Sequence, residues 1–244
     1  MSTVLLNLHK MANMSKSRLL ARFFKTGKGE YGEGDVFWGI TMPQIRSVVN
    51  QYYRELTLPD VQKLLDSEIH EVRMAGVLTL VYKYEKQAEL AEQKAIYNFY
   101  LKNAKRINNW DLVDVTCPHI MGAYLLNNDR AILYKLVKSK NLWERRMSIL
   151  ATAWFIRDKQ YTDTLKLAEL LLTDKHDLIH KAVGWMLREV GKREVDILHK
   201  FLEKYAKVMP RVMLRYAIEK LSFGERKEYL SKTTNLQMNR KCTN

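Results

Sequence analysis

The stretch HEVRMAGVLTL, residues 70–80, decides the class of fold. From Val72 to Tyr82, mostly apolar residues recur at spacings of three and four, which places them on one face of an α-helix. Turn-forming residues are scarce, because the chain has four prolines and ten glycines, and four of those glycines fall in GKGEYGEG, residues 27–34. We therefore predict an all-α fold of long helices with a glycine-rich loop at residues 27–34.

Outward from this stretch, similar segments recur along the chain. WERRMSILATA, IHKAVGWMLRE and RVMLRYAIEKL align with it on the cations Arg73, Arg146, Lys181 and Arg215. The last two steps are 35 and 34 residues and the first is 73, about twice the repeat, so one unit is missing near residue 109. Repeats of this length are typical of HEAT-type helical pairs, which predicts a curved α-solenoid with equivalent positions on its concave face.

We predict one such domain over residues 1–232, followed by a polar C-terminal tail at 233–244. With 47% apolar residues the chain has enough material for a core. No apolar run approaches the roughly 20 residues that a membrane-spanning helix needs, and no secretory signal is present. The only cysteines, Cys117 and Cys242, lack the spacing of a metal site. These features predict a cytoplasmic protein that contacts no membrane.

The charge of the chain points to a polyanionic partner. It has 41 Lys and Arg against 27 Asp and Glu, a net charge of +14, which is unusual for a metabolic enzyme and favours nucleic acid as the partner. The four aligned cations would form a stripe that neutralises phosphates. An alternative stays open for each of them, that the side chain only caps a turn or solvates a helix end.

NNWDLVD, residues 108–114, occupies the place of the missing unit. Trp110 and Asp114 are four residues apart and share one helix face, and Trp185 lies four residues after Lys181. Two rings and a carboxylate suit the hydrolysis of a bond whose leaving group is already cationic, because rings attract the cation and the carboxylate stabilises positive charge on the sugar. The set lacks a nucleophilic lysine, paired carboxylates and a metal cluster, which argues against acyl transfer and metal-assisted hydrolysis.

Two further motifs carry little weight. His176 and His180 form an HxxxH pair without an evident third ligand, so we predict no metal. GKGEYG matches G-x-G-x-x-G, but no strand precedes it, so we predict no nucleotide cofactor.

NNWDLVD, WERR and KAVGWMLRE together closely resemble the AlkD-like DNA alkylation repair family of bacterial HEAT-like DNA glycosylases. The resemblance runs from FWGITMPQIR at residue 37 through the last helical pair. It implies excision of positively charged alkylpurines from double-stranded DNA without a deep base-flipping pocket. By motif position it implies that Asp114 is catalytic, that Trp110 and Trp185 face the lesion, and that Arg146 binds the DNA backbone. Thr41 stands where the family has a glutamine near the DNA, which puts the contact to the opposite strand in doubt.

We therefore expect a monomeric, monofunctional glycosylase that needs no cofactor, in which Lys181, Arg73 and Arg215 extend the DNA-binding track. One alternative is a relative that binds damaged or branched DNA without cleaving it. Another is a scaffold for an acidic protein, for which the set of Trp110, Asp114 and Trp185 would have no purpose. Release of base from alkylated duplex separates the first two, and competition by plain duplex identifies the third.

Overall fold

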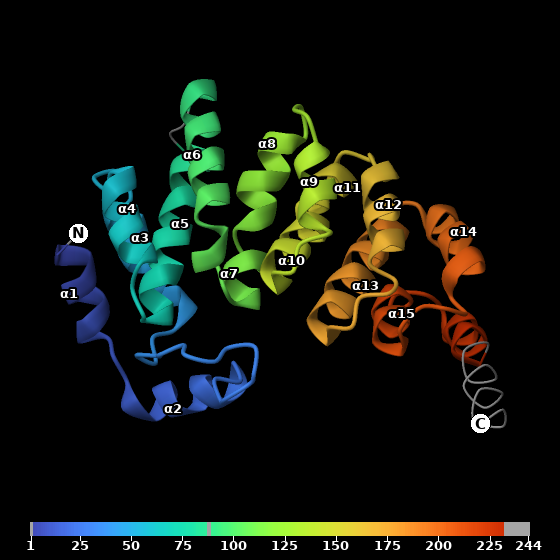
Figure 1. The fold of residues 1–244 in the computed structure, drawn as a ribbon, viewed down its shortest axis with the longest axis horizontal. Coiled ribbons are helices and arrows are strands. Elements are labelled where there is room, and N and C mark those ends of the chain that lie inside the picture. The colour runs from blue at the N-terminus through green and yellow to red at the C-terminus, as the bar shows by residue number, and fades with distance from the viewer. Residues whose placement is uncertain (1, 87–88, 232–244) are drawn as a thin grey trace. The chain divides into compact units, whose positions relative to one another are not determined.

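The computed structural model describes residues 2–86 and 89–231, and helices joined by turns and loops make up most of this part of the chain. The described residues contain no β-strand, only one isolated parallel bridge between Val36 and Ile69. The predicted all-α class built from helical pairs is confirmed (Figure 1). The tail predicted at residues 233–244 lies outside the described residues.

The backbone divides into two compact units, Met1–Tyr124 and Leu125–Asn244, and the boundary falls within the short helix α8 (Ala123–Leu125). A single domain over residues 1–232 stays a prediction. Before α8 the elements are α1 (Ser2–Lys10), α2 (Met14–Phe23), α3 (Met42–Tyr52), α4 (Leu58–Leu65), α5 (His70–Lys86), α6 (Leu90–Lys102), the 3₁₀ turn η1 (Ala104–Arg106), α7 (Trp110–Asp114) and the π-helical turn η2 (Pro118–Gly122). After it come α9 (Ala131–Leu136), α10 (Leu142–Leu150), α11 (Thr152–Arg157), α12 (Thr162–Leu170), α13 (Asp177–Gly191), α14 (Val195–Tyr205) and α15 (Arg211–Ala217).

All four prolines mark the beginnings of helices. Pro43, Pro59 and Pro118 stand in the first turns of α3, α4 and η2, and Pro210 is the N-cap of α15. Proline is tolerated there because the first helical N–H groups have no partner inside the helix. Thr57 adds a capping box, in which its side chain and that of Asp60 bond to one another's backbone N–H groups.

The first unit is built around α5. Every residue of α5 from His70 to Val81 is buried, because α3, α4, α6 and η2 all pack on this helix. A helix that is buried on all sides loses the amphipathic pattern of a surface helix. Its predicted apolar face is therefore only one part of what it buries.

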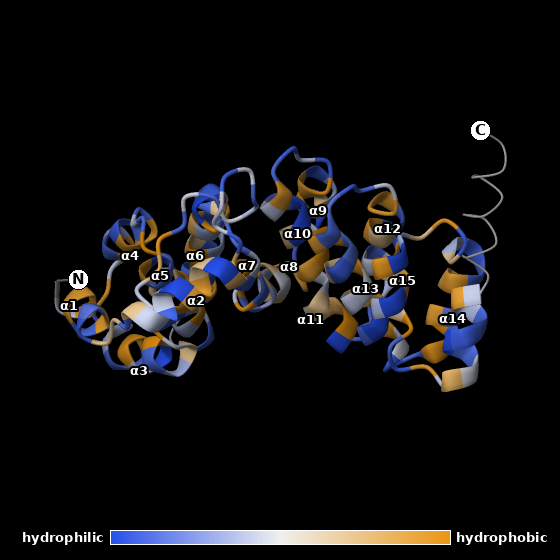
Figure 2. Ribbon diagram, turned by 90° about the horizontal axis from the view of Figure 1, so that it is seen from below, coloured by the Kyte–Doolittle hydropathy of each residue, from blue (hydrophilic) through white to orange (hydrophobic). Residues whose placement is uncertain are grey.

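The second unit is built around α13, which contacts α10, α11, α12, α14 and α15. Its approach to α15 is close, since a Cβ atom added at Gly184 would lie 2.5 Å from the carbonyl oxygen of Met213. The outer helix α14 buries Leu198 and Phe201 but exposes Lys200, and Figure 2 shows hydrophobic and hydrophilic residues side by side along it. No helix among the described residues is long and apolar enough to cross a membrane.

Candidate functional site

The motif NNWDLVD forms the short helix α7 together with its N-terminal cap. Asn109 is fully buried, and its side-chain oxygen accepts the N–H of Trp110 at 2.8 Å. Trp110 and Asp114 are the first and last residues of α7, and both are half-buried. The pair predicted to share one helix face is thus carried by one helical turn of the first unit.

The ring of Trp110 belongs to an aromatic stack. It lies over Phe24 with centroids 5.1 Å apart and meets Phe23 edge-on at 5.8 Å. Phe24 in turn stacks on Phe37 at 5.0 Å, and Phe37 stacks on His70 at 4.6 Å. Each such aromatic pair contributes about 0.5–1.5 kcal/mol beyond the area that it buries, so residues 23 and 24, far from the motif in sequence, help to orient Trp110.

A buried ionic network supports the other side of α7. His70 lies between two carboxylates, with Nδ1 3.1 Å from Asp35 and Nε2 2.9 Å from Asp111. Burial alone would lower the pKa of His70, but the hydrogen bonds and charges of Asp111 and Asp35 outweigh it and raise the pKa to about 9. His70 is therefore a cation at neutral pH. Through this cation Asp111, one carboxylate of the motif, links α7 to α5.

Asp35 is also held by Arg73 and Asn109. Arg73 Nη2 donates to it at 2.6 Å, and Asn109 Nδ2 donates at 2.9 Å. Burial would raise the pKa of Asp35, but the hydrogen bond of His70, the charge of Arg73 and the bond of Asn109 together lower it. Sequence spacing does not reveal this network. Its one visible signal was His70, Glu71 and Arg73 grouped at the start of an otherwise apolar helix.

Arg73 makes the contacts of a turn-capping residue, the alternative that the sequence left open. Its side chain is buried, and Nη1 donates to the carbonyl oxygens of Ser67 and Glu68, both at 3.0 Å. In the second unit Arg145 repeats these contacts with the carbonyls of Ser139 and Lys140. A DNA contact by Arg73 stays a prediction, but its bonding pattern relates it to Arg145 rather than to Arg146.

The position of each residue within its helix separates Arg73 from the other predicted cations. Counted from the first residue of each helix, Arg73, Arg145 and His180 stand fourth in α5, α10 and α13. His180 also bonds to a carbonyl six residues earlier, that of Asp174, at 2.6 Å. The residues that stand fifth in α7, α10, α13 and α15 are Asp114, Arg146, Lys181 and Arg215. Asp114 thus takes the repeat position that the later helices give to cations.

In the second unit, Arg146 reaches the first turn of α13. It is buried, and its Nη1 donates to the carbonyl oxygen of Leu178. Lys181, the fifth residue of α13, forms an ion pair with Asp177 at 2.6 Å. Trp185 lies one turn later and is half-buried. Arg215 is exposed on α15. The structure therefore groups Trp110 with Asp114 in one unit, and Arg146 with the helix of Lys181 and Trp185 in the other.

The two histidines of the HxxxH pair have structural roles. The His176 ring accepts the N–H of Leu178 as the N-cap of α13. Burial lowers the pKa of His176, and the nearby charge of Asp174 opposes this. Within the described residues, no group of three or more His, Cys, Asp or Glu side chains is placed to hold a metal ion.

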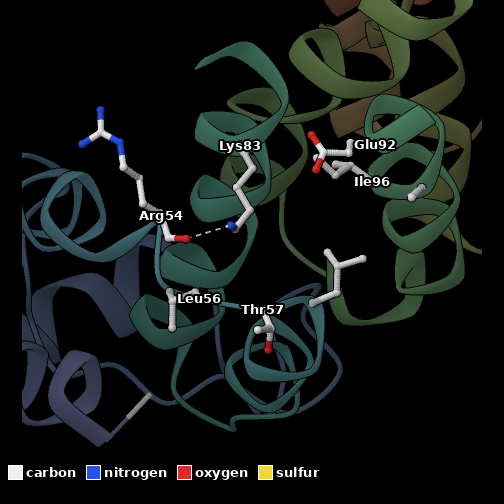
Figure 3. A pocket seen from close by; sticks show the side chains of 8 residues that line it. Arg54, Leu56, Thr57, Lys83, Glu92 and Ile96 are labelled. Atoms are coloured by element: carbon white, nitrogen blue, oxygen red, sulfur yellow. Dashed lines mark hydrogen bonds between the residues drawn. The ribbon is translucent and has the colours of Figure 1, made fainter. Parts of the chain in front are cut away.

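Two cavities of the first unit contain none of the predicted site residues. One, of about 310 Å³, is bordered by Phe23 and Phe24 and by His70 and Asp111, and so lies beside the aromatic stack. The other, of about 460 Å³, lies among α4, α5 and α6 (Figure 3). There Lys83 Nζ donates to the carbonyl oxygen of Arg54 at 3.4 Å, and burial lowers the pKa of Lys83 against the opposing charge of Glu92.

Comparison with known proteins gives a family and a fold. The family model described as DNA alkylation repair enzyme matches residues 4–221. No curated protein matches the chain. A solved structure described as a predicted DNA alkylation repair enzyme from Enterococcus faecalis shares 16% identity and a TM-score of 0.69, covering 87% of this chain and 98% of that one. AlkD2 from Streptococcus mutans shares 16% identity and a TM-score of 0.56, covering 85% and 98%.

At such low identity the solved structures establish the fold alone. The family model, in contrast, extends from within α1 through α15 and so includes α7, α10 and α13 with the site residues described above. The chain belongs to the family of DNA alkylation repair enzymes.

Proposed function

We propose that the chain is a monofunctional DNA glycosylase that excises N3- and N7-alkylated purines from double-stranded DNA. Family membership supports alkylated DNA as the substrate. The observation that supports the glycosylase chemistry is the placement of Asp114. It is a carboxylate at the fifth position of its helix, where α10, α13 and α15 carry cations, and it lies one turn after Trp110.

The reaction needs no general acid. An N3- or N7-alkylated purine is already positively charged, so its nitrogen can take the bonding pair when the N-glycosidic bond breaks. The sugar then becomes an oxocarbenium-like cation, which a carboxylate stabilises, and water adds at the anomeric carbon and loses a proton. A stabilisation of a few kcal/mol would accelerate such a labile bond by about 10²–10⁴-fold.

Each proposed residue has a separate task. Asp114 stabilises the sugar cation and orients the water. Trp110 and Trp185 hold the alkylated nucleotide, since an aromatic face attracts a cation by about 0.5–2 kcal/mol. Trp110 is suited to this task because contacts with Phe23 and Phe24 favour one orientation of its ring.

The proposed DNA-backbone contacts are Arg146, Lys181 and Arg215, all fifth in their helices. A guanidinium matches the geometry of a phosphate better than an ammonium group does, so Arg146 carries the main contact. The proposal further has the protein act as a monomer in the bacterial cytoplasm, associated with the nucleoid while bound to DNA.

The test is release of 7-methylguanine from methylated duplex DNA, measured by chromatography. We expect Asp114→Asn to abolish release while duplex affinity stays within a few-fold of wild type. Asp129→Asn is the matched control, because Asp129 is exposed and its carboxylate accepts the N–H of Ala131 in a local turn. Equal release by wild type and Asp114→Asn would refute the role of Asp114. Duplex binding by wild type without any release would favour the non-cleaving relative instead.

A further inference from the structure

A second basic surface lies in the unit of residues 125–244, on residues that the proposed glycosylase chemistry does not use. It is a groove of about 670 Å³ between α12 and α14, closed at one end by the turn before α12, and we name it the α12–α14 groove. Figure 1 shows α12 and α14 above α13 and α15, the helices that carry Lys181, Trp185 and Arg215.

The rim of the groove is positively charged. Four exposed lysines border it, and none of them forms a salt bridge with a residue in the described part of the chain: Lys159, Lys166, Lys200 and Lys204. Of the two carboxylates, Asp163 is occupied by Arg130 at 2.8 Å and by the hydroxyl of Tyr134 at 2.6 Å. Among the residues that line the groove, this leaves one carboxylate, Glu169, to oppose the four lysines, so the groove attracts anions.

One residue that lines the groove, Tyr161, carries an unsatisfied polar atom. Tyr161 is 8% exposed, and its hydroxyl has no hydrogen-bond partner among the described residues. Burying a hydroxyl without a partner is unfavourable, and such groups in native structures call for an explanation. A ligand atom that enters the groove and accepts a hydrogen bond would supply the missing partner.

The lysine at the end of the groove is kept in a strained conformation. Lys159 has a φ of 60° and follows α11, where its N–H donates to Ile156 and the N–H of Gln160 donates to Phe155. This left-handed position after a helix usually belongs to glycine. A lysine there is less favourable than a glycine and places a cation at the closed end of the groove, which indicates a use for its charge.

We propose that the α12–α14 groove binds a single strand of nucleic acid. The lysines on both rims would contact successive phosphates, and the Tyr161 hydroxyl would donate to an acceptor on the strand. An apolar surface for sugar and base is provided within the groove by Leu165, Ile197 and Phe201. Lysine is a point charge that recognises phosphate without reading sequence, and basic grooves with aromatic side chains are typical of sites for single strands.

A single strand fits this groove better than a duplex does. Tyr161 lines the groove and is 8% exposed, and its hydroxyl is buried, so a ligand that bonds to this hydroxyl must enter the space between the helices. A flexible strand can do so, whereas a duplex is stiff over about 150 base pairs and keeps its phosphates on a wide cylinder. An acidic peptide also carries negative charge, and the experiment below treats it as the competing partner.

The test is fluorescence anisotropy of a labelled twelve-nucleotide oligothymidylate with the full chain, titrated at several salt concentrations. The groove variant is Lys166→Gln/Lys200→Gln/Lys204→Gln. The matched control is Lys135→Gln/Lys138→Gln/Lys207→Gln, which removes the same charge from exposed lysines of the same unit outside the groove. Each phosphate contact contributes about 0.7 to the salt slope of a single-strand complex, so we expect the groove variant to lower the slope by about 2 and the control to leave it unchanged.

Two single substitutions test the individual features. Lys159→Gly relieves the left-handed strain, so we expect a melting temperature equal to or above that of wild type together with weaker oligonucleotide binding. A merely structural lysine would give the first effect without the second. Tyr161→Phe should weaken binding several-fold at every salt concentration and leave the slope unchanged, because it removes a hydrogen bond and no charge.

The result that overturns the proposal is an equal loss of binding in the groove and control variants, which would mean diffuse attraction by the net charge. Displacement of the oligonucleotide by oligoglutamate at lower concentration than by unlabelled oligothymidylate would also overturn it, in favour of an acidic protein. The outcome is independent of the glycosylase proposal. Asp114→Asn should bind the oligonucleotide as wild type does, and the groove variant should release 7-methylguanine as wild type does.

Discussion

At the scale of single residues, the two carboxylates of NNWDLVD have different surroundings. Asp111 faces His70, whereas Asp114 stands in the repeat register of the later cations. Helical spacing was enough to pair Asp114 with Trp110, because positions four apart share a face. It could not reveal that Asp35, more than thirty residues before His70, completes a buried network, since only the fold brings those residues together. The roles of Asp114 and Trp110 in catalysis stay predictions.

The network around His70 makes stability depend on pH. Its pKa is raised to about 9 in the folded chain and is near 6.5 when the chain is unfolded. Between these values the folded state keeps a proton that the unfolded state has lost, so the free energy of unfolding decreases as pH rises. The gap corresponds to about 3 kcal/mol, fully present below pH 6.5 and lost by the time the pH has passed about 9.

Chemical denaturation at a series of pH values from 6 to 10 measures this dependence. In His70→Gln the decrease across the interval should be absent. The control is His9→Gln, because the His9 ring packs edge-on against Trp38 at 5.1 Å; this variant should retain the decrease. A decrease that survives in His70→Gln would show that another group is responsible.

Adjacent arginines in WERR provide a second prediction at this scale. Arg145 caps the turn before α10 and binds Asp174 at 2.7 Å, whereas Arg146 is the proposed phosphate contact. Lysine cannot reproduce the branched donor geometry of arginine, so Arg145→Lys should lower the free energy of unfolding by about 1–3 kcal/mol. Duplex affinity of the folded protein should stay near that of wild type.

Arg146→Lys should give the reverse, a loss of duplex affinity larger than its loss of stability. Denaturation and anisotropy on both variants separate the two roles. If Arg145→Lys weakens DNA binding more than Arg146→Lys does, the register that places residue 145 in the turn and residue 146 at the DNA is wrong.

At the scale of elements, sequence periodicity found the repeat and aligned Arg146, Lys181 and Arg215 correctly, but it placed Arg73 one residue out of register. The alignment placed Arg73 with Arg146, while the bonding pattern places Arg73 with Arg145. A one-residue error is invisible in a pattern of apolar spacings, because helix beginnings are set by caps such as Asn141 and His176 rather than by the apolar face. The all-α class did not depend on this detail.

The packing of α13 on α15 yields a prediction about Gly184. In an open helix, alanine in place of glycine would be favourable by about 1 kcal/mol. Here a Cβ atom would lie 2.5 Å from both the Met213 oxygen and the Tyr216 Cβ atom, and separating two helices costs about 1–3 kcal/mol. We therefore expect Gly184→Ala to lower the melting temperature.

The control for this change is Gly224→Ala. Gly224 lies in the helical residues 223–231, and an added Cβ atom there would meet nothing within 4 Å. Its melting temperature should equal or exceed that of wild type. A stabilised Gly184→Ala would mean that α13 and α15 lie further apart than the structure places them.

At the scale of the whole molecule, the proposed chemistry draws on both compact units. Trp110 and Asp114 belong to residues 1–124, whereas Arg146, Lys181 and Trp185 belong to residues 125–244. Sequence spacing relates residues within a helix and, through the repeat, between equivalent helices. It carries no information on whether Asp114 and Trp185 of one chain meet the same nucleotide, and their convergence is therefore part of the proposal and has its own test.

That test is complementation between inactive variants. If the lesion is held by Asp114 and Trp185 of a single chain, then Asp114→Asn and Trp185→Ala should each lose base release, and an equimolar mixture should be no more active than the mean of the two. If instead one copy supplied the carboxylate and another the ring, a fraction of the mixed pairs would contain one intact site. Release of 7-methylguanine would then rise above both variants and increase with protein concentration. Since the proposal assigns all the chemistry to a monomer, such a rise would contradict it even if both residues proved essential.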